Sequence, residues 1–148
     1  MTIRLFMKLR RKLQTFLDMP GADRLLVCEA MLTLAFARLI VLTVPFRFLA
    51  PWLSRVPQTS SSDKALILRV RKAITVAARN VPWSAVCLHQ AIAAKAILAR
   101  RGCGSSFHLG ANYCAQGKLI AHSWLVAGDT VVVGAAGIGS VTPLARFG

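Results

Sequence analysis

The sequence predicts an α+β fold, in which a series of helices is followed by a small antiparallel sheet. Apolar residues recur at helical spacing up to Gly102, which is placed to end the last helix. Beyond it the pattern changes to alternation, with turn sequences at Gln116-Gly117 and Gly128-Asp129. We expect three strands there, at 105–112, 118–126 and 130–133.

Helical segments divide the chain before those strands. Residues 1–57 form a helical arm, with a basic amphipathic helix over 1–17 and an apolar helix over 24–43 that stops at Pro45. Residues 58–64 are polar and of low complexity, which predicts a linker. Residues 65–148 form the functional core, which begins with helices over 65–78 and 85–101.

Composition limits the classes of function. Hydrophobic residues make up 55% of the 148 positions, so the chain has enough apolar surface to fold. A net charge of +14 favours a neighbour that is an acidic protein, an RNA or an anionic membrane. Only one acid lies in the second half, which excludes a paired-carboxylate mechanism there. The five acids are Asp18, Asp23, Glu29, Asp63 and Asp129.

The apolar helix over 24–43 raises the question of a membrane span. Glu29 and Arg38 lie inside it, which makes it a poor spanning helix, and we expect it to be buried on several sides. The basic helix over 1–17 is suited to peripheral membrane contact. Because no secretory signal opens the chain, we expect a cytoplasmic protein, with possible membrane association, whose four cysteines are reduced.

Cys87 and His122 form the constellation that could carry chemistry. If Ser84 caps the helix over 85–101, Cys87 lies in its first turn, where free N–H groups and the helix dipole favour a thiolate. The same N–H groups could hold an oxyanion. His122 lies in the middle of an apolar strand of the sheet. A cysteine at a helix start facing a histidine on a packed sheet is the layout of a papain-like nucleophile and base.

Each residue also has a plainer interpretation. A free cysteine on an apolar helix is often a core residue, and Trp83 and Trp124 could be core aromatics rather than walls of a cleft. A zinc site is the rival use of the cysteines and histidines, but no Cys-x-x-Cys pair occurs. Its pairs would be Cys87 with His89, Cys103 with His108, and His108 with Cys114. We expect His89 at the surface, His108 facing away from its apolar neighbours, and Gly134, Gly137 and Gly139 in a flexible turn.

Several blocks of sequence carry a resemblance to a known family. They are Pro82-Trp83-Ser84-Ala85-Val86-Cys87-Leu88-His89-Gln90-Ala91, Leu98-Ala99-Arg100-Arg101-Gly102, Phe107-His108-Leu109-Gly110, Ala121-His122-Ser123-Trp124 and Thr142-Pro143-Leu144. Together with the apolar segment from Leu25 to Phe46, they resemble the B proteins of lasso-peptide biosynthesis, which are leader peptidases. That family belongs to the transglutaminase-like branch of the papain-like cysteine peptidases.

The resemblance implies an activity and partners. It implies a cysteine endopeptidase that removes the leader from a ribosomal precursor peptide, with Cys87 as nucleophile and His122 as general base and acid. The chain resembles the split form of the family, which needs a separate PqqD-like leader-recognition protein. An asparagine-synthetase-like lasso cyclase then consumes the core peptide, and ATP belongs to that cyclase, so we expect no cofactor here. The helical arm could dock on a partner, an exporter or a membrane, and no specific nucleic acid is expected.

The third catalytic residue is the open point. The family completes a Cys-His-Asp triad, and Asp129 is the only acid after Asp63. A two-residue turn at Gly128-Asp129 would place Asp129 at a hairpin tip, with His122 opposite Gly134 or Ala135. Seven residues of strand span roughly 20 Å, which is too far for a hydrogen bond. Asp129 therefore stands beside other candidates to orient His122, namely Asn112, Gln90 or a backbone carbonyl.

Two other functions remain open at this point. The same thioester could transfer an acyl group to an amine instead of water. The chain could also be a non-catalytic basic module or scaffold that binds a membrane surface or a protein partner.

Overall fold

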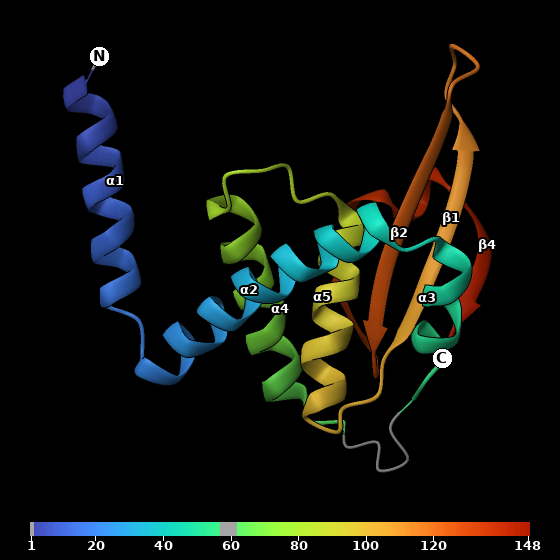
Figure 1. Ribbon diagram of the computed structural model, residues 1–148, viewed down its shortest axis with the longest axis horizontal. Coiled ribbons are helices and arrows are strands. Elements are labelled where there is room, and N and C mark those ends of the chain that lie inside the picture. The colour runs from blue at the N-terminus through green and yellow to red at the C-terminus, as the bar shows by residue number, and fades with distance from the viewer. Residues whose placement is uncertain (1, 57–61) are drawn as a thin grey trace.

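The computed structural model describes residues 2–56 and 62–148, and it confirms the α+β fold (Figure 1). Within these residues the helices are α1 (Thr2–Leu17), α2 (Gly21–Thr43), α3 (Phe46–Leu53), α4 (Lys64–Asn80) and α5 (Cys87–Arg100). The strands are β1 (Ser106–Tyr113), β2 (Leu119–Ala127), β3 (Thr130–Val133) and β4 (Thr142–Phe147), with the 3-10 helix η1 (Ala135–Ser140) before β4. They form one antiparallel sheet in the order β3-β2-β1-β4.

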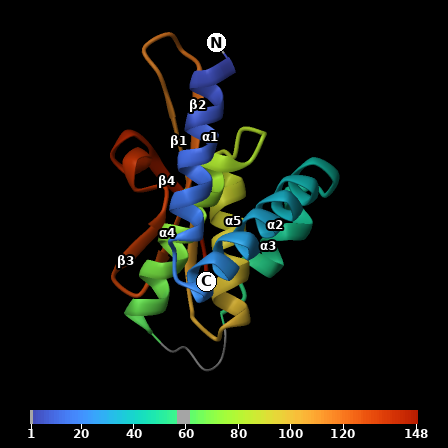
Figure 2. The ribbon, with the colours of Figure 1, turned by 90° about the vertical axis from the view of Figure 1, so that its left-hand side faces the viewer.

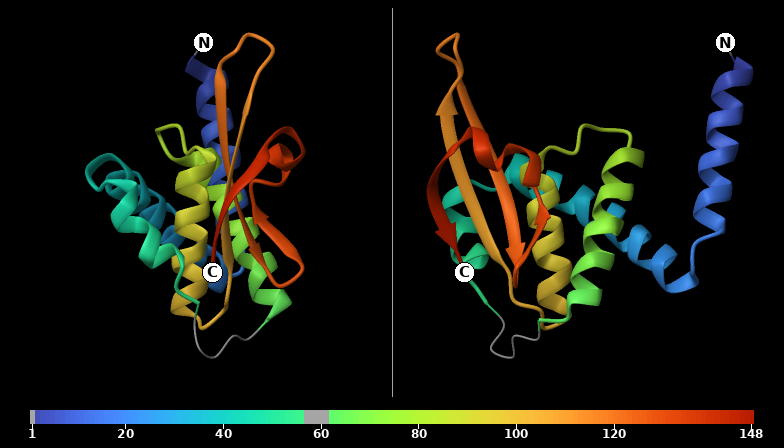
Figure 3. Two further views of the ribbon diagram at one scale, coloured as in Figure 1. Left: turned by 90° about the vertical axis from the view of Figure 1, so that its right-hand side faces the viewer. Right: turned by 180° about the vertical axis from the view of Figure 1, so that it is seen from behind.

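Helix α5 is the centre of the molecule. It packs between α2 and α4 on one side and strands β2 and β3 on the other, and its alanines let these neighbours approach closely. Ala91, Ala93 and Ala94 are fully buried. The sheet lies between α5 and η1 (Figures 2 and 3). One face of the sheet thus belongs to the core, and we call the other, on the η1 side, the outer face.

Helix α4 follows directly from its sequence. Asp63 caps it, because its Oδ1 accepts hydrogen bonds from the backbone N–H of Ala65 at 3.0 Å and of Leu66 at 3.2 Å. Buried side chains recur along it at helical spacing, namely Ile67, Val70, Ala73, Ile74 and Ala77. The predicted linker over 58–64 lies mostly outside the described residues, and the core of α4 and α5 continues into α2 without a break.

Helix α2 departs from the prediction that it is buried on several sides. One face joins the core through Leu26, Val27, Ala30, Leu34 and Ala37. The opposite face is exposed, because no described element packs on it and because α5 and α4 both lie on the same side of α2. By length and composition alone α2 could cross a membrane, with a mean hydropathy of 2.2, but that property is shared by core helices of soluble proteins.

The sheet has a fourth strand that the sequence did not predict. Pro143 lies inside β4, and proline is a signal against a strand because it cannot donate to a ladder. Here β4 is the edge strand, so the missing donor is tolerated. The glycines predicted to form a flexible turn instead belong to η1 and the residue before it, Gly134.

A buried lysine links α5 to the start of the sheet. Lys95 is only 2% exposed, and its Nζ donates a hydrogen bond to the carbonyl of Ser105 at 2.7 Å. Burial lowers the pKa of Lys95. The hydrogen bond holds the short connection between α5 and β1 in place. It therefore fixes where β1 begins relative to α5.

Candidate active site

Cys87 is the first residue of α5 and is partly exposed. The residue before it, Val86, is extended and provides no side-chain cap. The N–H groups of the first turn therefore have no acceptor within the helix, and they surround the thiol with the positive end of the helix dipole. This position offers hydrogen-bond donors for an oxyanion beside the thiol.

The predicted capping by Ser84 is wrong, because the helix begins at Cys87, two residues later than predicted. The side chain of Gln90 explains the later start. Its Nε2 donates a hydrogen bond to the carbonyl of Ala85 at 2.6 Å, which holds the segment before Cys87 extended. The consequence is that Cys87 is the first residue of the helix rather than its third.

His122 points to the outer face of the sheet. Leu125 and Ala127 on the same strand belong to the core, so strand alternation directs His122 and Trp124 the other way. The rings of His122 and Trp124 stack at 6.2 Å between centroids. The His122 Nε2 lies 2.7 Å from the carbonyl oxygen of Gly134, the residue that leads from β3 into η1.

This contact determines which nitrogen of the imidazole can act as a base. A carbonyl oxygen can only accept a hydrogen bond, so Nε2 must carry the proton and donate it. In the neutral ring Nδ1 then holds the lone pair. A backbone carbonyl, one of the predicted alternatives, therefore orients the ring and selects its tautomer.

Helix η1 fixes the other side of the ring through Gly137. A Cβ at this position would lie 2.6 Å from both Cδ2 and Cε1 of His122, which is closer than side chains tolerate. We expect Gly137→Ala to displace the imidazole and weaken its hydrogen bond to the Gly134 carbonyl. The overpacking should lower the free energy of unfolding by about 1–3 kcal/mol. The ring nitrogen chemical shifts of His122 should change, as measured by NMR.

Gly139→Ala is the matched control, because no heavy atom lies within 4 Å of a Cβ there. Its His122 shifts should equal those of the unmodified chain. Identical shifts in both variants would show that η1 does not constrain the ring.

Cys87 and His122 lie at the same end of the fold but on opposite faces of the sheet, because α5 packs on the core face and His122 points to the outer face. The start of α5, the N-terminal half of β2 and η1 come together at this end (Figures 1 and 3). The predicted arrangement, in which the cysteine faces the histidine, is therefore not formed by these side chains in the structure. No hydrogen bond joins Cys87 Sγ to the imidazole among the described residues, and neither residue lines the two cavities described below. Catalytic hydrogen bonds are often long in ligand-free proteins and shorten when substrate binds.

Asp129 is not brought to His122. It lies at the tip of the β2–β3 hairpin, as predicted, since Ala127 pairs with Thr130 and Gly128 adopts a φ of 57°. Its carboxylate accepts a hydrogen bond from Thr130 Oγ1 at 3.1 Å and lies 3.5 Å from Lys64 Nζ. The Thr130 hydroxyl and then Lys64 lower the pKa of Asp129. The carboxylate thus joins the hairpin to α4 at the surface.

The amides that could have replaced Asp129 are also occupied elsewhere. Asn112 donates from Nδ2 to the carbonyl of Ser140 at 3.2 Å and accepts from the N–H of Tyr113. Gln90 is bonded to Ala85. In the described part of the chain, the Gly134 carbonyl is thus the hydrogen-bond partner of the His122 ring.

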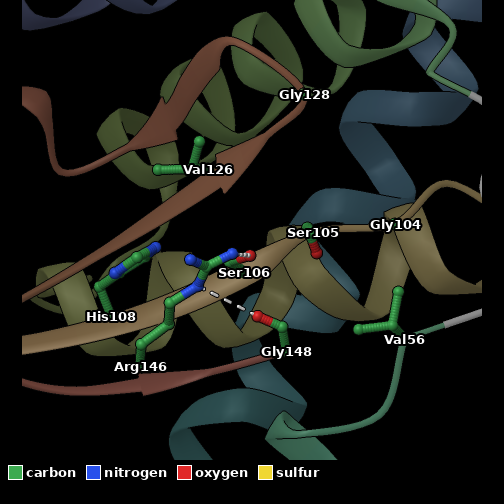
Figure 4. Close-up of a pocket in the computed structure, with 9 residues that line it drawn as sticks. All are labelled: Val56, Gly104, Ser105, Ser106, His108, Val126, Gly128, Arg146 and Gly148. Carbon is green, nitrogen blue, oxygen red and sulfur yellow. Dashed lines mark hydrogen bonds between the residues drawn. The ribbon is translucent and has the colours of Figure 1, made fainter.

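The two tryptophans do not share a cleft. Trp124 is 5% exposed and lies on the outer face between His122 and His108, whose ring stacks on it at 5.2 Å. Trp83 packs against the core before α5. Further along the outer face, His108, Val126 and Arg146 line a cavity of about 440 Å³ (Figure 4). Arg146 there bonds Ser106 Oγ and the carbonyl of Gly148, both at 3.3 Å.

The remaining histidine and cysteines do not form a metal centre in the described residues. No group of three potential ligands comes together among them. His89 is buried rather than at the surface, and burial, followed by the charge of Arg38, lowers its pKa. Cys103 is buried, and burial raises the pKa of its thiol, so it is a core residue.

Sequence reasoning missed the two glycines that hold His122, Gly134 and Gly137. Gly134 acts through its backbone carbonyl, which every residue has, and Gly137 acts by having no side chain against the ring. Neither role is marked by a reactive side chain in the sequence. The cluster of glycines after β3 was the available clue, since glycine is also used where the backbone approaches another group closely.

Comparison with known proteins agrees with this arrangement. Neither the search of curated proteins nor that of solved structures gives a match. Residues 30–146 match the family described as the transglutaminase-like superfamily, which includes cysteine peptidases. The matched range includes α3 to α5, all of the sheet except the last residue of β4, Cys87 and His122. A helix that begins at a cysteine and packs on an antiparallel sheet bearing a histidine fits that match, and the chain belongs to the transglutaminase-like superfamily.

Proposed function

We propose that this protein is a cysteine endopeptidase in which Cys87 is the nucleophile and His122 the general base and acid. The observation that carries the proposal is Cys87 as the first residue of α5, where the N–H groups of the first turn can bind an oxyanion. The bond between His122 Nε2 and the Gly134 carbonyl leaves Nδ1 as the basic nitrogen of the ring, and the proposal requires Nδ1 to reach Cys87 when substrate binds. The family match supports peptidase chemistry of this kind.

The chemistry follows from these positions. The Cys87 thiolate attacks the scissile carbonyl, and the N–H groups of the first turn of α5 bind the oxyanion of the tetrahedral intermediate. His122 Nδ1, protonated by the thiol, gives that proton to the leaving amine and a thioester forms. His122 then takes a proton from water, which attacks the thioester, releases the acid and regenerates Cys87.

The substrate we propose is the leader segment of a ribosomal precursor peptide during lasso-peptide maturation. The sequence blocks around Cys87 and His122 support it through their resemblance to the B proteins. The chain would act with a PqqD-like leader-recognition protein, and an asparagine-synthetase-like cyclase would use ATP on the released core. A net charge of +14 suits an acidic partner, because complementary charge speeds encounter. The chain would need no cofactor and would act in the cytoplasm.

The proposal is tested by reconstitution. The full chain, the recognition protein and the precursor peptide are mixed, and the products are followed by mass spectrometry. We expect a leader ending in a carboxylate and a core with a free N-terminal amine. With the folded chain present, an intact precursor would overturn the proposal, whereas a leader joined to an added amine would reassign it to acyl transfer.

The same assay separates a triad from a dyad. Since Asp129 is bonded to Thr130 and Lys64, we expect Asp129→Asn to release the leader within about twofold of the normal rate, far from the loss of roughly 10⁴ seen when an orienting aspartate is removed from a triad. A loss larger than tenfold would restore the orienting role to Asp129.

A further inference from the structure

Helix α2 carries an exposed apolar stripe that nothing in the described residues covers. Its members share one face of the helix and contain no charged side chain. They are Leu25, Cys28, Leu32, Phe36, Leu39 and Leu42, and four of the five leucine and phenylalanine side chains are more than 60% exposed. From Leu25 to Leu42 the stripe is about 26 Å long, at 1.5 Å per residue.

The stripe continues onto the neighbouring helix α3. Phe36 of α2 and Phe48 of α3 both line a largely apolar groove of about 450 Å³ between these helices and α5. Phe48 is 62% exposed, and the guanidinium of Arg47 lies 4.9 Å from the centre of its ring. Figure 1 shows α2 crossing in front of α4 and α5 and leading into α3, so this surface is one side of the molecule. Single exposed apolar residues are normal, but a continuous patch marks a contact surface.

Positive charge accompanies the stripe. The two acids of α2 are neutralised by ion pairs, Asp23 with Arg69 at 2.8 Å, and Glu29 with Arg100 and Arg101, both at 2.6 Å. The basic side chains of α1 are exposed and form no ion pair among the described residues, namely Lys8, Arg10, Arg11 and Lys12. These basic side chains lie on the helix that leads into α2, and Arg47 lies beside Phe48 at the α3 end of the stripe.

We infer that the stripe of α2 binds the surface of an anionic phospholipid bilayer. Apart from the Cys28 thiol, the stripe offers no side-chain hydrogen-bond donor or acceptor, whereas protein interfaces use about one hydrogen bond per 100–200 Å². Lipid hydrocarbon demands none. A second copy is disfavoured because it would bring two chains of charge +14 together. Apolar helices with basic neighbours bind anionic lipid surfaces in this way.

The helix lies on the bilayer and does not span it. Its opposite face contributes Val27, Ala30 and Leu34 to the core, all at most 1% exposed, and Glu29 holds the end of α5. A spanning orientation would remove all of these contacts. The inference does not rest on the proposed peptidase activity.

Vesicle flotation tests the inference. The full chain should float with vesicles of phosphatidylglycerol mixed with phosphatidylcholine and not with phosphatidylcholine alone. Phe36→Ser should weaken the binding about tenfold, because one large apolar contact is lost. Leu144→Ser is the matched control, since Leu144 lies on β4, outside the stripe, and is 69% exposed. This variant should bind the vesicles as tightly as the unmodified chain.

Three results would overturn the inference. They are a chain that stays with the solution, equal binding by Phe36→Ser and Leu144→Ser, and a dimer in solution that Phe36→Ser dissociates. The last would assign the stripe to a second copy. Both substitutions are at exposed positions, so circular dichroism should show unchanged folding.

Discussion

Cys87→Ala should abolish leader release, lowering the rate by a factor on the order of 10³ or more, because no other group can form the thioester. Cys87 contributes to the reaction and little to the stability of the fold, since it is partly exposed and is the first residue of α5. The loss should therefore appear without a change in melting temperature. Single-turnover release, followed by mass spectrometry, is the measurement.

Two further variants make this prediction specific. Cys114→Ala removes another partly exposed thiol, in the turn after β1, and should keep the normal rate. His122→Ala should be nearly as damaging as Cys87→Ala, and the double variant no worse, since the two residues act as one unit. Release by the Cys87→Ala chain at the normal rate would exclude Cys87 as nucleophile and leave the binding-module interpretation.

Gly134→Ala should destabilise the protein by about 3 kcal/mol or more. Its φ is 84°, a left-handed conformation that costs other residues roughly 1–2 kcal/mol. In addition, a Cβ would lie 2.5 Å from the carbonyl oxygen of Ser123 and 2.8 Å from Cβ of Trp124, so the backbone must move. The melting temperature should fall by roughly 6–12 °C, because each kcal/mol is worth about 2–4 °C at this chain length.

Gly117→Ala separates the two causes. Gly117 has a similar φ of 71°, but nothing lies within 4 Å of a Cβ there. This variant should lose only the conformational part, about 1–2 kcal/mol. Equal losses in both variants, measured by urea denaturation, would mean that the close packing of Gly134 against β2 contributes nothing.

The sequence predicted what depends on local pattern. The helices of the first part of the chain and strands β1 to β3 are marked by the spacing of their apolar residues, and the hairpin is marked by Gly128-Asp129. The structure contains all of these elements. Cys87 at a helix start was predictable for the same reason, although the cap was not, because a side chain four residues into the helix, Gln90, decides where that helix begins.

What could not be predicted depends on contacts between distant segments. Pro143 argues against a strand until the edge position of β4 is known. The partner of His122 is a backbone carbonyl, which every residue type possesses equally. The exposure of one face of α2 could not be read from an all-apolar helix, since its periodicity does not say which side meets the core.

The chain has only five acidic residues, so each ion pair contributes more to holding the helices together than its surface position would suggest. Asp23 and Glu29 both lie on α2, where they attach it to α4 and to the end of α5. The hydrogen bond from Arg101 and the pairing with Arg100 lower the pKa of Glu29, so its contribution is present at neutral pH and is lost as acid titrates the folded carboxylate. With no spare carboxylates nearby, protonation leaves the guanidinium groups to repel one another. Acidification should therefore loosen α2 from the helices behind it before the alanine-rich centre of α5 is disturbed.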